Sequence, residues 1–488
     1  MASIEQQAAK GAAWTIGAGL GSRVLGVLST LLLTHYIAPD DYGAVIIAMV
    51  LVVTTASISS FGLSQYLVIR PDLQKDETFH VSLFHVLGTL TSLTALVYFR
   101  EPIVRWLDTP SALIYVPGLS VALAMDRLGI LPERLMSRRM QFRRIALSRA
   151  AAETTYAAVA VLFAIAGFEG MSIIYANVAR FGLLAVIMYW FISARDLFSP
   201  TRLRWSIIRR IFWFGGPLSL DELSHFASRQ WDNLLMGRFF GDAVTGNYNL
   251  AYNLADIPAA HIGEHIGDVL LPSFSKMAAD RRRWALLRAT GFLAIIVFPM
   301  AIGLAVVAPT LTETVFDPRW NLVGPMLMLL AGLSIVRPIG WTMTSFLQSL
   351  SETRVLMILG IVRLVILLAA LYAFKPLGPL WACMAAGLAY SLHALGTMWV
   401  VSKKDGVRIR EILSQLWSPI AACVPMVLMV LGVRYIMTSG GWSVGWLMLG
   451  CEILTGCLVY ILAMRIISPL LFSSVLTQLT GIIAGKPA

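Results

Sequence analysis

Charge is scarce in this chain of 488 residues. Only 13% of the residues are charged and 58% are hydrophobic, with a mean hydropathy of +0.75. A soluble domain averages about 25% charged and about 45–50% apolar residues. The shortage of charge therefore excludes an ordinary soluble protein and predicts a chain whose surface faces lipid over much of its area.

Cysteine is scarce as well, with four residues, Cys383, Cys423, Cys451 and Cys457. All four lie within apolar runs, none has the spacing of metal ligands, and no loop carries a pair. We expect them to be small core residues, and we expect no disulfide framework.

Long connections and enzyme motifs are also missing. No loop between apolar runs has room for a soluble catalytic domain, and the chain lacks a nucleophile triad, a glycine-rich phosphate loop and a metal-binding Asp-x-Asp. We therefore expect no enzyme activity, no cofactor and no bound metal.

Apolar runs are what the chain has in abundance. A membrane-spanning helix needs about 20 predominantly apolar residues. The first run follows Glu5 and Lys10 and is long enough to span, so we expect it to remain as a helix and not to be cleaved as a signal. The sequence predicts an all-α polytopic membrane protein with about fourteen transmembrane helices, at 12–35, 42–68, 80–99, 112–133, 146–167, 170–194, 208–236, 243–272, 286–310, 321–349, 355–374, 378–401, 415–437 and 443–467.

Basic residues are distributed unevenly between the predicted connections. The net charge is +11, yet connections that follow odd-numbered helices hold six basic residues, whereas the other loops and the termini hold twenty-five. Lys and Arg gather on the cytoplasmic side of membrane proteins. The asymmetry predicts that both termini are cytoplasmic, and it explains the basic excess without a nucleic-acid partner.

Two segments about two hundred residues apart are similar. Residues 31–48 align with 234–251, with Gly43 opposite Gly246, and the turns "GFEG" (167–170) and "KPLG" (375–378) recur at nearly the same offset. We infer a six-helix parallel repeat. The predicted domains are an N-terminal lobe at 1–205, a C-terminal lobe at 206–405, and helices 13 and 14 with a tail at 406–488, an architecture that suits alternating access.

Arginine is unexpectedly common inside the predicted spans. Burying one at mid-helix costs about 2.5–3.5 kcal/mol on insertion scales. Local pairing explains some of them, since Arg229 and Asp232 stand at i and i+3, and Arg149 and Glu153 at i and i+4. The seven arginines that we single out are Arg23, Arg127, Arg149, Arg180, Arg229, Arg337 and Arg363.

Three of these arginines have no acidic neighbour that the sequence identifies. Arg23 lies in mid-span, Arg337 precedes Pro338 where the helix should break, and Arg363 has no carboxylate within a turn. Such arginines face a wet cavity or an anion, and the guanidinium fork suits phosphate. We predict a cationic lumen lined by members of the set Arg23, Arg127, Arg229, Arg337 and Arg363.

The predicted eighth span carries His261, Glu264, His265 and Asp268. The two histidines have the i, i+4 spacing of a zinc helix, but the Glu stands three residues after the first His and no third ligand is evident. A metal site, a proton or cation relay, and a hydrophilic face on a kinked, cavity-lining helix all remain open, and we favour the last.

Four stretches carry a family resemblance that covers nearly the whole chain. They are "DNLLMGRFFGDAVTGNYNLAY" (232–252), "LTHYIAPDDYGAVIIAM" (33–49), "LPSFSKM" (271–277) and "LPERLMSRRMQFRRIALSRA" (131–150). With them the chain resembles the polysaccharide transporter branch of the multidrug/oligosaccharidyl-lipid/polysaccharide (MOP) exporter superfamily, the Wzx-type lipid-linked oligosaccharide flippases. The fold that this implies is MATE-like.

The resemblance implies a flippase of the bacterial inner membrane. Its substrate would be an undecaprenyl-diphosphate-linked repeat unit, moved from the cytoplasmic to the periplasmic leaflet for exopolysaccharide, capsule or O-antigen assembly. Membrane lipids, a polysaccharide polymerase and export machinery would be its partners. The family's ion coupling would fall on Glu153 or Asp232.

Two other functions compete with this interpretation. A multidrug or cation antiporter of the same superfamily would need unpaired carboxylates in the cavity, whereas this sequence offers arginines. A membrane glycan polymerase or ligase would need a long periplasmic catalytic loop, which the chain lacks.

Overall fold

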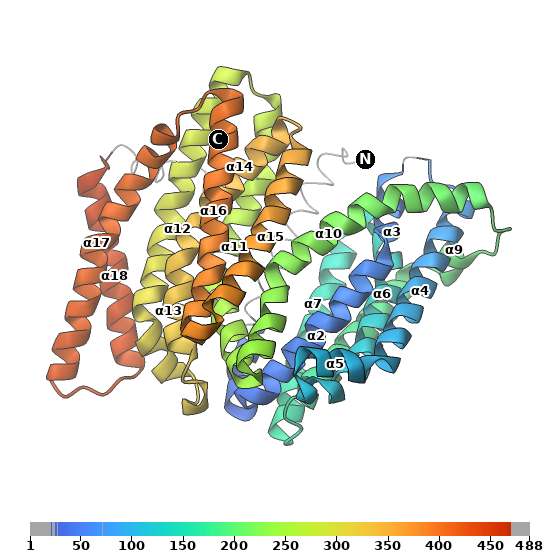
Figure 1. The fold of residues 1–488 in the computed structure, drawn as a ribbon, viewed down its shortest axis with the longest axis horizontal. Helices are drawn as coiled ribbons and strands as arrows, with labels where there is room; N and C mark the ends of the chain where they lie inside the picture. Colours follow the sequence, from blue (N-terminus) through green and yellow to red (C-terminus); the bar gives the residue numbers. More distant parts are fainter. Residues whose placement is uncertain (1–20, 22–24, 27, 71, 470–488) are drawn as a thin grey trace. The chain divides into compact units, whose positions relative to one another are not determined.

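The structure is a computed structural model that describes residues 21, 25–26, 28–70 and 72–469. Over those residues every regular element is a helix (Figure 1). The all-α polytopic prediction is therefore confirmed for this part of the chain. Most of the predicted first span, 12–35, with Arg23, lies outside the described residues.

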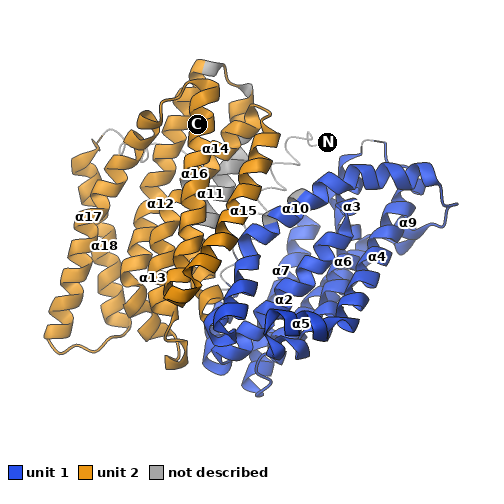
Figure 2. Ribbon diagram, viewed as in Figure 1, with its two compact units in different colours: residues 1–246 blue, residues 247–488 orange. Residues whose placement is uncertain are grey.

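The chain divides into two compact units, residues 1–246 and 247–488 (Figure 2). The division falls inside one helix, α11, five residues after it begins at Asp242. The predicted six-helix repeat and the predicted domain ranges stay predictions.

Unit 1 is a bundle in which α6 packs between α2, α4 and α8, and α7 packs on α8. Its helices are α2 (Pro39–Ser60), α3 (Leu63–Ile69), α4 (Lys75–Tyr98), α5 (Arg100–Leu107), η1 (Pro110–Ile114), α6 (Val116–Arg138), α7 (Phe142–Ile165), α8 (Met171–Phe191), α9 (Ala194–Phe198), α10 (Trp205–Phe240) and the start of α11 (Asp242–Lys276).

Unit 2 contains the rest of α11 and a bundle in which α12 contacts α13, α14, α17 and α18. Two neighbouring pairs, α15 with α16 and α17 with α18, lie side by side (Figure 1). The helices are α12 (Ala279–Val315), η2 (Pro318–Trp320), α13 (Val323–Leu333), η3 (Ser334–Val336), α14 (Arg337–Ser349), α15 (Thr353–Phe374), η4 (Lys375–Leu377), α16 (Pro379–Asp405), α17 (Ile409–Ser439) and α18 (Trp446–Ile467).

Ten helical segments in the described part of the chain are long and apolar enough to cross a membrane. They correspond to ten of the fourteen predicted spans. Three further predicted spans, 112–133, 208–236 and 243–272, form the long helices α6, α10 and α11, but these are more polar and are not among the ten. The count of fourteen therefore depends on α6, α10, α11 and the largely undescribed first span.

The turns that the sequence predicts are present. Gly167 in "GFEG" and Gly378 in "KPLG" both have a positive φ, 84° and 99°. The predicted break at Arg337 is also confirmed, because α13 ends in the 3-10 turn η3 and α14 begins at Arg337. One predicted span, 42–68, is instead divided into α2 and α3 by two left-handed residues, Phe61 and Gly62.

The two glycines that the sequence alignment pairs also meet in space. A Cβ on Gly43 would overlap the carbonyl oxygen of Asp242, and a Cβ on Gly246 would overlap that of Pro39. Each glycine thus lets its own helix approach the first residue of the other, α2 against α11, within unit 1. Only a residue without a Cβ permits this approach.

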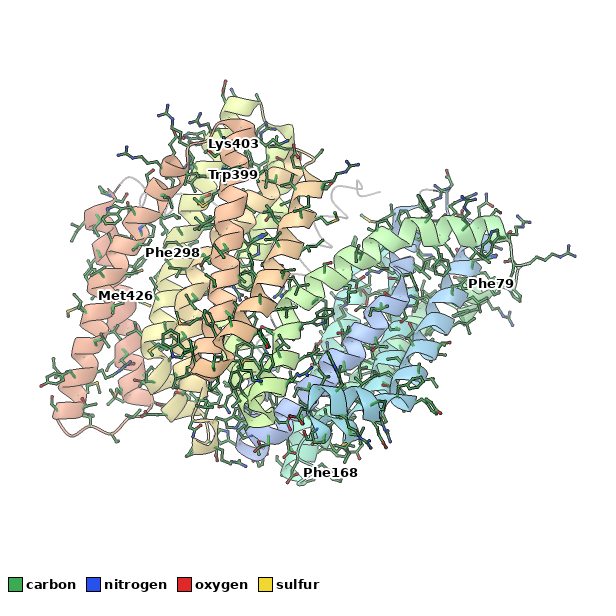
Figure 3. The ribbon with its side chains drawn as sticks, viewed as in Figure 1. Phe79, Phe168, Phe298, Trp399, Lys403 and Met426 are labelled. Carbon is green, nitrogen blue, oxygen red and sulfur yellow. The ribbon has the colours of Figure 1, made fainter. Side chains whose placement is uncertain are left out.

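Each unit has an apolar core of its own. In unit 1, one core cluster centres on α2 and α6 and contains Ile47 and Leu119. In unit 2 the largest cluster contains Phe298 of α12 and Met426 of α17, both labelled in Figure 3. Burial of these side chains stabilises the bundles that hold the polar groups described next.

Candidate functional site

Aromatic and basic side chains gather in unit 2. Tyr252 and Asp256 come from α11, Arg337 from the start of α14, Arg363 from α15 and Tyr390 from α16. We call these five residues the Arg–Tyr cluster. Its members come from four helices, so it forms only when unit 2 folds.

Tyr390 lies at the centre of the cluster. The Cζ of Arg337 lies 4.6 Å from the Tyr390 ring centroid and 5.1 Å from that of Tyr252. The Cζ of Arg363 lies 5.2 Å from the Tyr390 centroid. The two phenol oxygens are 3.1 Å apart. Cation–π contacts at these distances lower the free-energy cost of keeping a guanidinium group out of bulk water.

Arg337 is also ion-paired. Its guanidinium contacts the carboxylate of Asp256 across the cluster, and the two side chains remain 10% and 13% exposed. Arg337 starts α14 directly after the 3-10 turn η3, where Pro338 follows it in the first turn. A 3-10 segment inside a longer helix changes the direction of the side chains that follow it. Here η3 comes directly before Arg337, whose side chain reaches Asp256 on α11.

Arg363 differs from Arg337 in its surroundings. Its Nε is buried and has no hydrogen-bond partner. His393 of α16 lies nearby and its Nδ1 is 3.3 Å from the carbonyl oxygen of Leu359. The described cluster therefore contains two guanidinium groups and one carboxylate, an excess of positive charge that suits an anion.

The other predicted site arginines lie in unit 1. Arg127 on α6 has a side chain only 12% exposed, 3.9 Å from the carboxylate of Asp126. Arg229 is partly buried on α10, where Asp232 is 1% exposed and accepts hydrogen bonds from the amide and side chain of Asn233. The structure brings Arg337 and Arg363 together, whereas Arg127 and Arg229 stand on separate helices of the other unit.

The predicted local pair of Arg149 and Glu153 is wrong. Arg149 binds Glu133 of α6 through two nitrogens, at 2.6 and 3.2 Å, and Glu153 binds Arg180 of α8 at 2.5 Å. Both pairs join neighbouring helices. The physical reason is that a carboxylate buried between helices is better satisfied by a bidentate guanidinium across the interface than by one on its own exposed face.

An apolar cavity in unit 2, which we call the apolar groove, lies on a different side of α11 from Tyr252 and Asp256. It has a volume of about 440 Å³ and is lined by side chains of α11, α12, α17 and α18, among them Leu254, Ile257, Met426 and Tyr460. Successive helix residues are turned by about 100°. Leu254 therefore points away from Tyr252 and Asp256, and Ile257 is turned by about 100° from Asp256, so α11 lies between this groove and the Arg–Tyr cluster.

One buried ion pair at the groove was not predicted. Glu452 of α18 is fully buried and accepts hydrogen bonds from Arg434 Nε at 2.7 Å and from the Thr310 hydroxyl at 2.9 Å. Arg434 lies within α17 and within the predicted span 415–437. The signal in the sequence was Glu452 itself, an acidic residue in an apolar run that needs a cationic partner.

Metal ligands do not gather in the described part of the chain, where no group of three or more His, Cys, Asp or Glu could hold an ion. The side chains of His261, Glu264, His265 and Asp268 lie outside the described ones. The alternatives for that stretch stay open.

A family profile described as "Polysaccharide biosynthesis protein" matches residues 32–325, which is more than half of the chain. The chain belongs to this family. It is a multi-pass membrane protein of the polysaccharide transporter branch of the MOP superfamily, so the resemblance seen in its sequence is confirmed.

Two relatives of the family are similar to the chain along most of its length. The succinoglycan biosynthesis transport protein ExoT of Rhizobium meliloti (strain 1021) is 27% identical over 441 residues, covering 88% of this chain and 86% of the relative. The lipopolysaccharide biosynthesis protein WzxC of Escherichia coli (strain K12) is 23% identical over 442 residues, covering 87% of each.

Solved structures agree on the fold. The lipid II flippase MurJ in an inward closed conformation superposes with a TM-score of 0.74 at 14% identity, over 92% of this chain and 97% of that one. An inward-facing multidrug resistance MATE family transporter of the MOP superfamily gives a TM-score of 0.59 at 16% identity, over 79% and 95%. At these identities the likeness establishes the fold alone.

Proposed function

We propose that this family member is a flippase of the bacterial inner membrane, with both termini in the cytoplasm. Its substrate is an undecaprenyl-diphosphate-linked oligosaccharide repeat unit, which it moves from the cytoplasmic to the periplasmic leaflet by alternating access. The product supplies assembly of an exopolysaccharide, capsule or O-antigen, with a polysaccharide polymerase and export machinery acting downstream.

The Arg–Tyr cluster is the observation that carries this proposal. The cluster offers two guanidinium groups on one tyrosine ring, and its single described carboxylate neutralises only one of them. Guanidinium binds phosphate oxygens through its planar fork, and tyrosine rings and hydroxyls suit sugar rings. A lipid-linked diphosphate sugar presents both groups together.

The apolar groove supports a lipid-linked substrate as well. Its walls are almost wholly hydrocarbon, and the polar groups at Glu452 are already engaged by Arg434 and Thr310. A polyprenyl chain gains free energy in proportion to the apolar area that it buries there. We assign the headgroup to the cluster and part of the lipid tail to the groove on the other side of α11.

The cation antiporter is the alternative within the superfamily. Cationic drugs would need an uncompensated carboxylate, but Asp256, Glu153 and Glu452 are each paired with an arginine. These pairings favour an anionic substrate. Glu153 and Asp232 stay proposals for ion coupling, and Arg23, Arg127 and Arg229 stay proposals for the cationic path.

A substitution experiment tests the headgroup site. Replacing Arg337 or Arg363 with Gln removes one charge-assisted contact of about 1.5–3 kcal/mol, so we expect flipping to fall about tenfold or more. The measurement is translocation of a fluorescent lipid-linked oligosaccharide in proteoliposomes, alongside surface polysaccharide in cells that produce the same amount of protein.

Arg288→Gln provides the matched control. Arg288 lies in the same unit and also stacks on an aromatic ring, 4.9 Å from the Trp284 centroid, but on α12 outside the cluster. Its loss should leave flipping unchanged. Full activity of both cluster variants would remove the cluster from the transport path, and export of a cationic dye in place of the lipid-linked sugar would favour the antiporter.

A further inference from the structure

The carboxylate of Asp256 occupies the position in the Arg–Tyr cluster where an anionic ligand would bind. It contacts the Arg337 guanidinium, which is stacked between Tyr252 and Tyr390. Carboxylate and phosphate oxygens use the same N–H groups of an arginine. A ligand phosphate and Asp256 therefore compete for Arg337.

The Arg337–Asp256 pair has a partly accessible carboxylate, unlike the Arg434–Glu452 pair. Arg337 and Asp256 retain 10% and 13% of their side-chain exposure, whereas Glu452 is fully buried and also bound by Thr310. An exchange of partners at Arg337 needs little rearrangement of the helices. The Glu452 carboxylate has no comparable access, although its partner Arg434 is 22% exposed.

The charges of the cluster limit what can bind while Asp256 remains ionised. A diphosphate that is esterified at both ends carries one negative charge on each phosphate, and the cluster supplies two guanidinium groups. These charges balance only if Asp256 is neutral. Leaving an ionised carboxylate unpaired beside a bound dianion is costly in partly buried surroundings.

We propose that Asp256 is the resident counter-ion of this anion site, displaced by the substrate diphosphate and neutralised by one proton as the substrate binds. The proton comes from water and bonds to a carboxylate oxygen of Asp256 while the Arg337 N–H groups transfer to phosphate oxygens. When the diphosphate leaves, Asp256 releases the proton and pairs again with Arg337. This inference rests on the proposed function, and it assigns substrate-linked protonation to α11.

The charged and titratable groups of the described cluster agree with this role. Tyr252 comes from the same helix as Asp256, Arg337 from α14, Arg363 from α15, and Tyr390 and His393 from α16. The carboxylate that faces these described groups is that of Asp256. Neutralising it raises the net positive charge of the site, which strengthens its attraction for phosphate.

Ligand binding to the full-length protein in nanodiscs tests the proposal. The probe is a short prenyl diphosphate esterified to one sugar, whose phosphates do not titrate near neutral pH. Wild-type affinity should increase as the pH falls from about 8 to about 5, because protonation of a carboxylate frees Arg337. At about pH 8, Asp256→Asn should bind the probe about tenfold more tightly than the wild type does, and its affinity should no longer depend on pH.

Proton uptake gives a second, independent measurement. Calorimetry in buffers of different ionisation enthalpy should show about one proton taken up per bound ligand in the wild type and none in Asp256→Asn. Glu411→Gln is the matched control, since Glu411 also pairs with an arginine, Arg283 at 2.6 Å, outside the cluster. It should keep wild-type affinity, pH dependence and proton uptake.

The variants separate the possible failures. If Asp256→Asn weakens binding while Arg337→Gln and Arg363→Gln abolish it, the site is correct but Asp256 only positions Arg337. If the two arginine variants bind normally, the proposed headgroup site itself fails. Should Asp256→Asn fold poorly, the wild-type protein decides by itself: binding that does not tighten between about pH 8 and about pH 5, or that takes up no proton, contradicts the proposal.

Discussion

Guanidinium groups within the helices of this protein are stabilised in two ways. Arg149 and Arg180 form ion pairs with glutamates of neighbouring helices, and Arg434 does so with Glu452. Arg363 instead stacks on Tyr390 and lacks a hydrogen bond at Nε. The first arrangement suits a structural role, and the second leaves binding capacity for a ligand.

The Arg434–Glu452 pair allows a prediction about stability. Glu452→Gln removes the fully buried partner of the pair, whereas the Arg434 side chain is 22% exposed, so the unfolding free energy should fall by about 1–3 kcal/mol. The double variant Glu452→Gln/Arg434→Met should recover most of that loss. Denaturant unfolding in detergent measures both variants.

A surface pair on α5 serves as the control for this measurement. Arg105 and Glu101 are 79% and 59% exposed, so Glu101→Gln should change stability by less than about 1 kcal/mol. If Glu101→Gln and Glu452→Gln lowered the unfolding free energy equally, burial of the carboxylate would not determine how much stability its loss costs.

At the scale of elements, three long helices differ from the rest in polarity. α6, α10 and α11 carry Arg127, Arg229, Asp232 and Asp256, whereas the ten apolar segments have the composition expected of helices that face lipid. Polar groups inside a membrane protein face other helices or water. These three helices therefore carry four of the proposed binding and coupling residues, whereas Arg337, Arg363 and Glu153 stand on apolar segments.

The contact between α2 and α11 gives a prediction about packing. Gly43→Ala would place a Cβ against the backbone carbonyl of Asp242, which cannot rotate away, so we expect a loss of about 1–3 kcal/mol of stability. Gly216→Ala on α10 is the control, because no atom lies within 4 Å of the added Cβ. It should be neutral or stabilising by up to about 1 kcal/mol.

Thermal unfolding midpoints in detergent compare these two glycine variants. A neutral Gly43→Ala would mean that α2 and α11 approach less closely than described. Such a result would also remove the spatial support for pairing Gly43 with Gly246 in an internal repeat.

At the scale of the whole molecule, the topology depends on whether the polar helices cross the membrane. If α6, α10 and α11 span, reporters fused at Arg105 and Gly241 lie in the periplasm, and reporters at Arg143 and Arg282 lie in the cytoplasm. The physical reason is that an odd number of spanning helices separates each successive site, with the basic connections inside. Paired periplasmic and cytoplasmic reporter enzymes measure the sidedness.

Each alternative gives a different pattern of reporter activity. If α6 did not span, Arg105 and Arg143 would report the same side. If α10 and α11 together did not span, Gly241 would report the same side as Arg282. Either result would contradict the fourteen-helix topology.

Sequence reasoning succeeded where a single segment carries the signal. The apolar runs, the turns at Gly167 and Gly378 and the break before Arg337 each follow from neighbouring residues, and the structure confirms them. Helix formation in lipid depends on local composition because each segment must satisfy its own backbone hydrogen bonds. The division of the span 42–68 at Phe61 was missed because its residues give no strong turn signal.

By itself, the sequence determined that this is a polytopic all-α membrane protein of a polysaccharide biosynthesis family with arginines inside its spans. Only the tertiary structure decided which charges meet. The partner of Arg337 is Asp256, eighty-one residues earlier, and that of Glu153 is Arg180 on the next helix. A side chain's partners across helices depend on the rotation and depth of each helix in the bundle, which packing sets and local sequence does not.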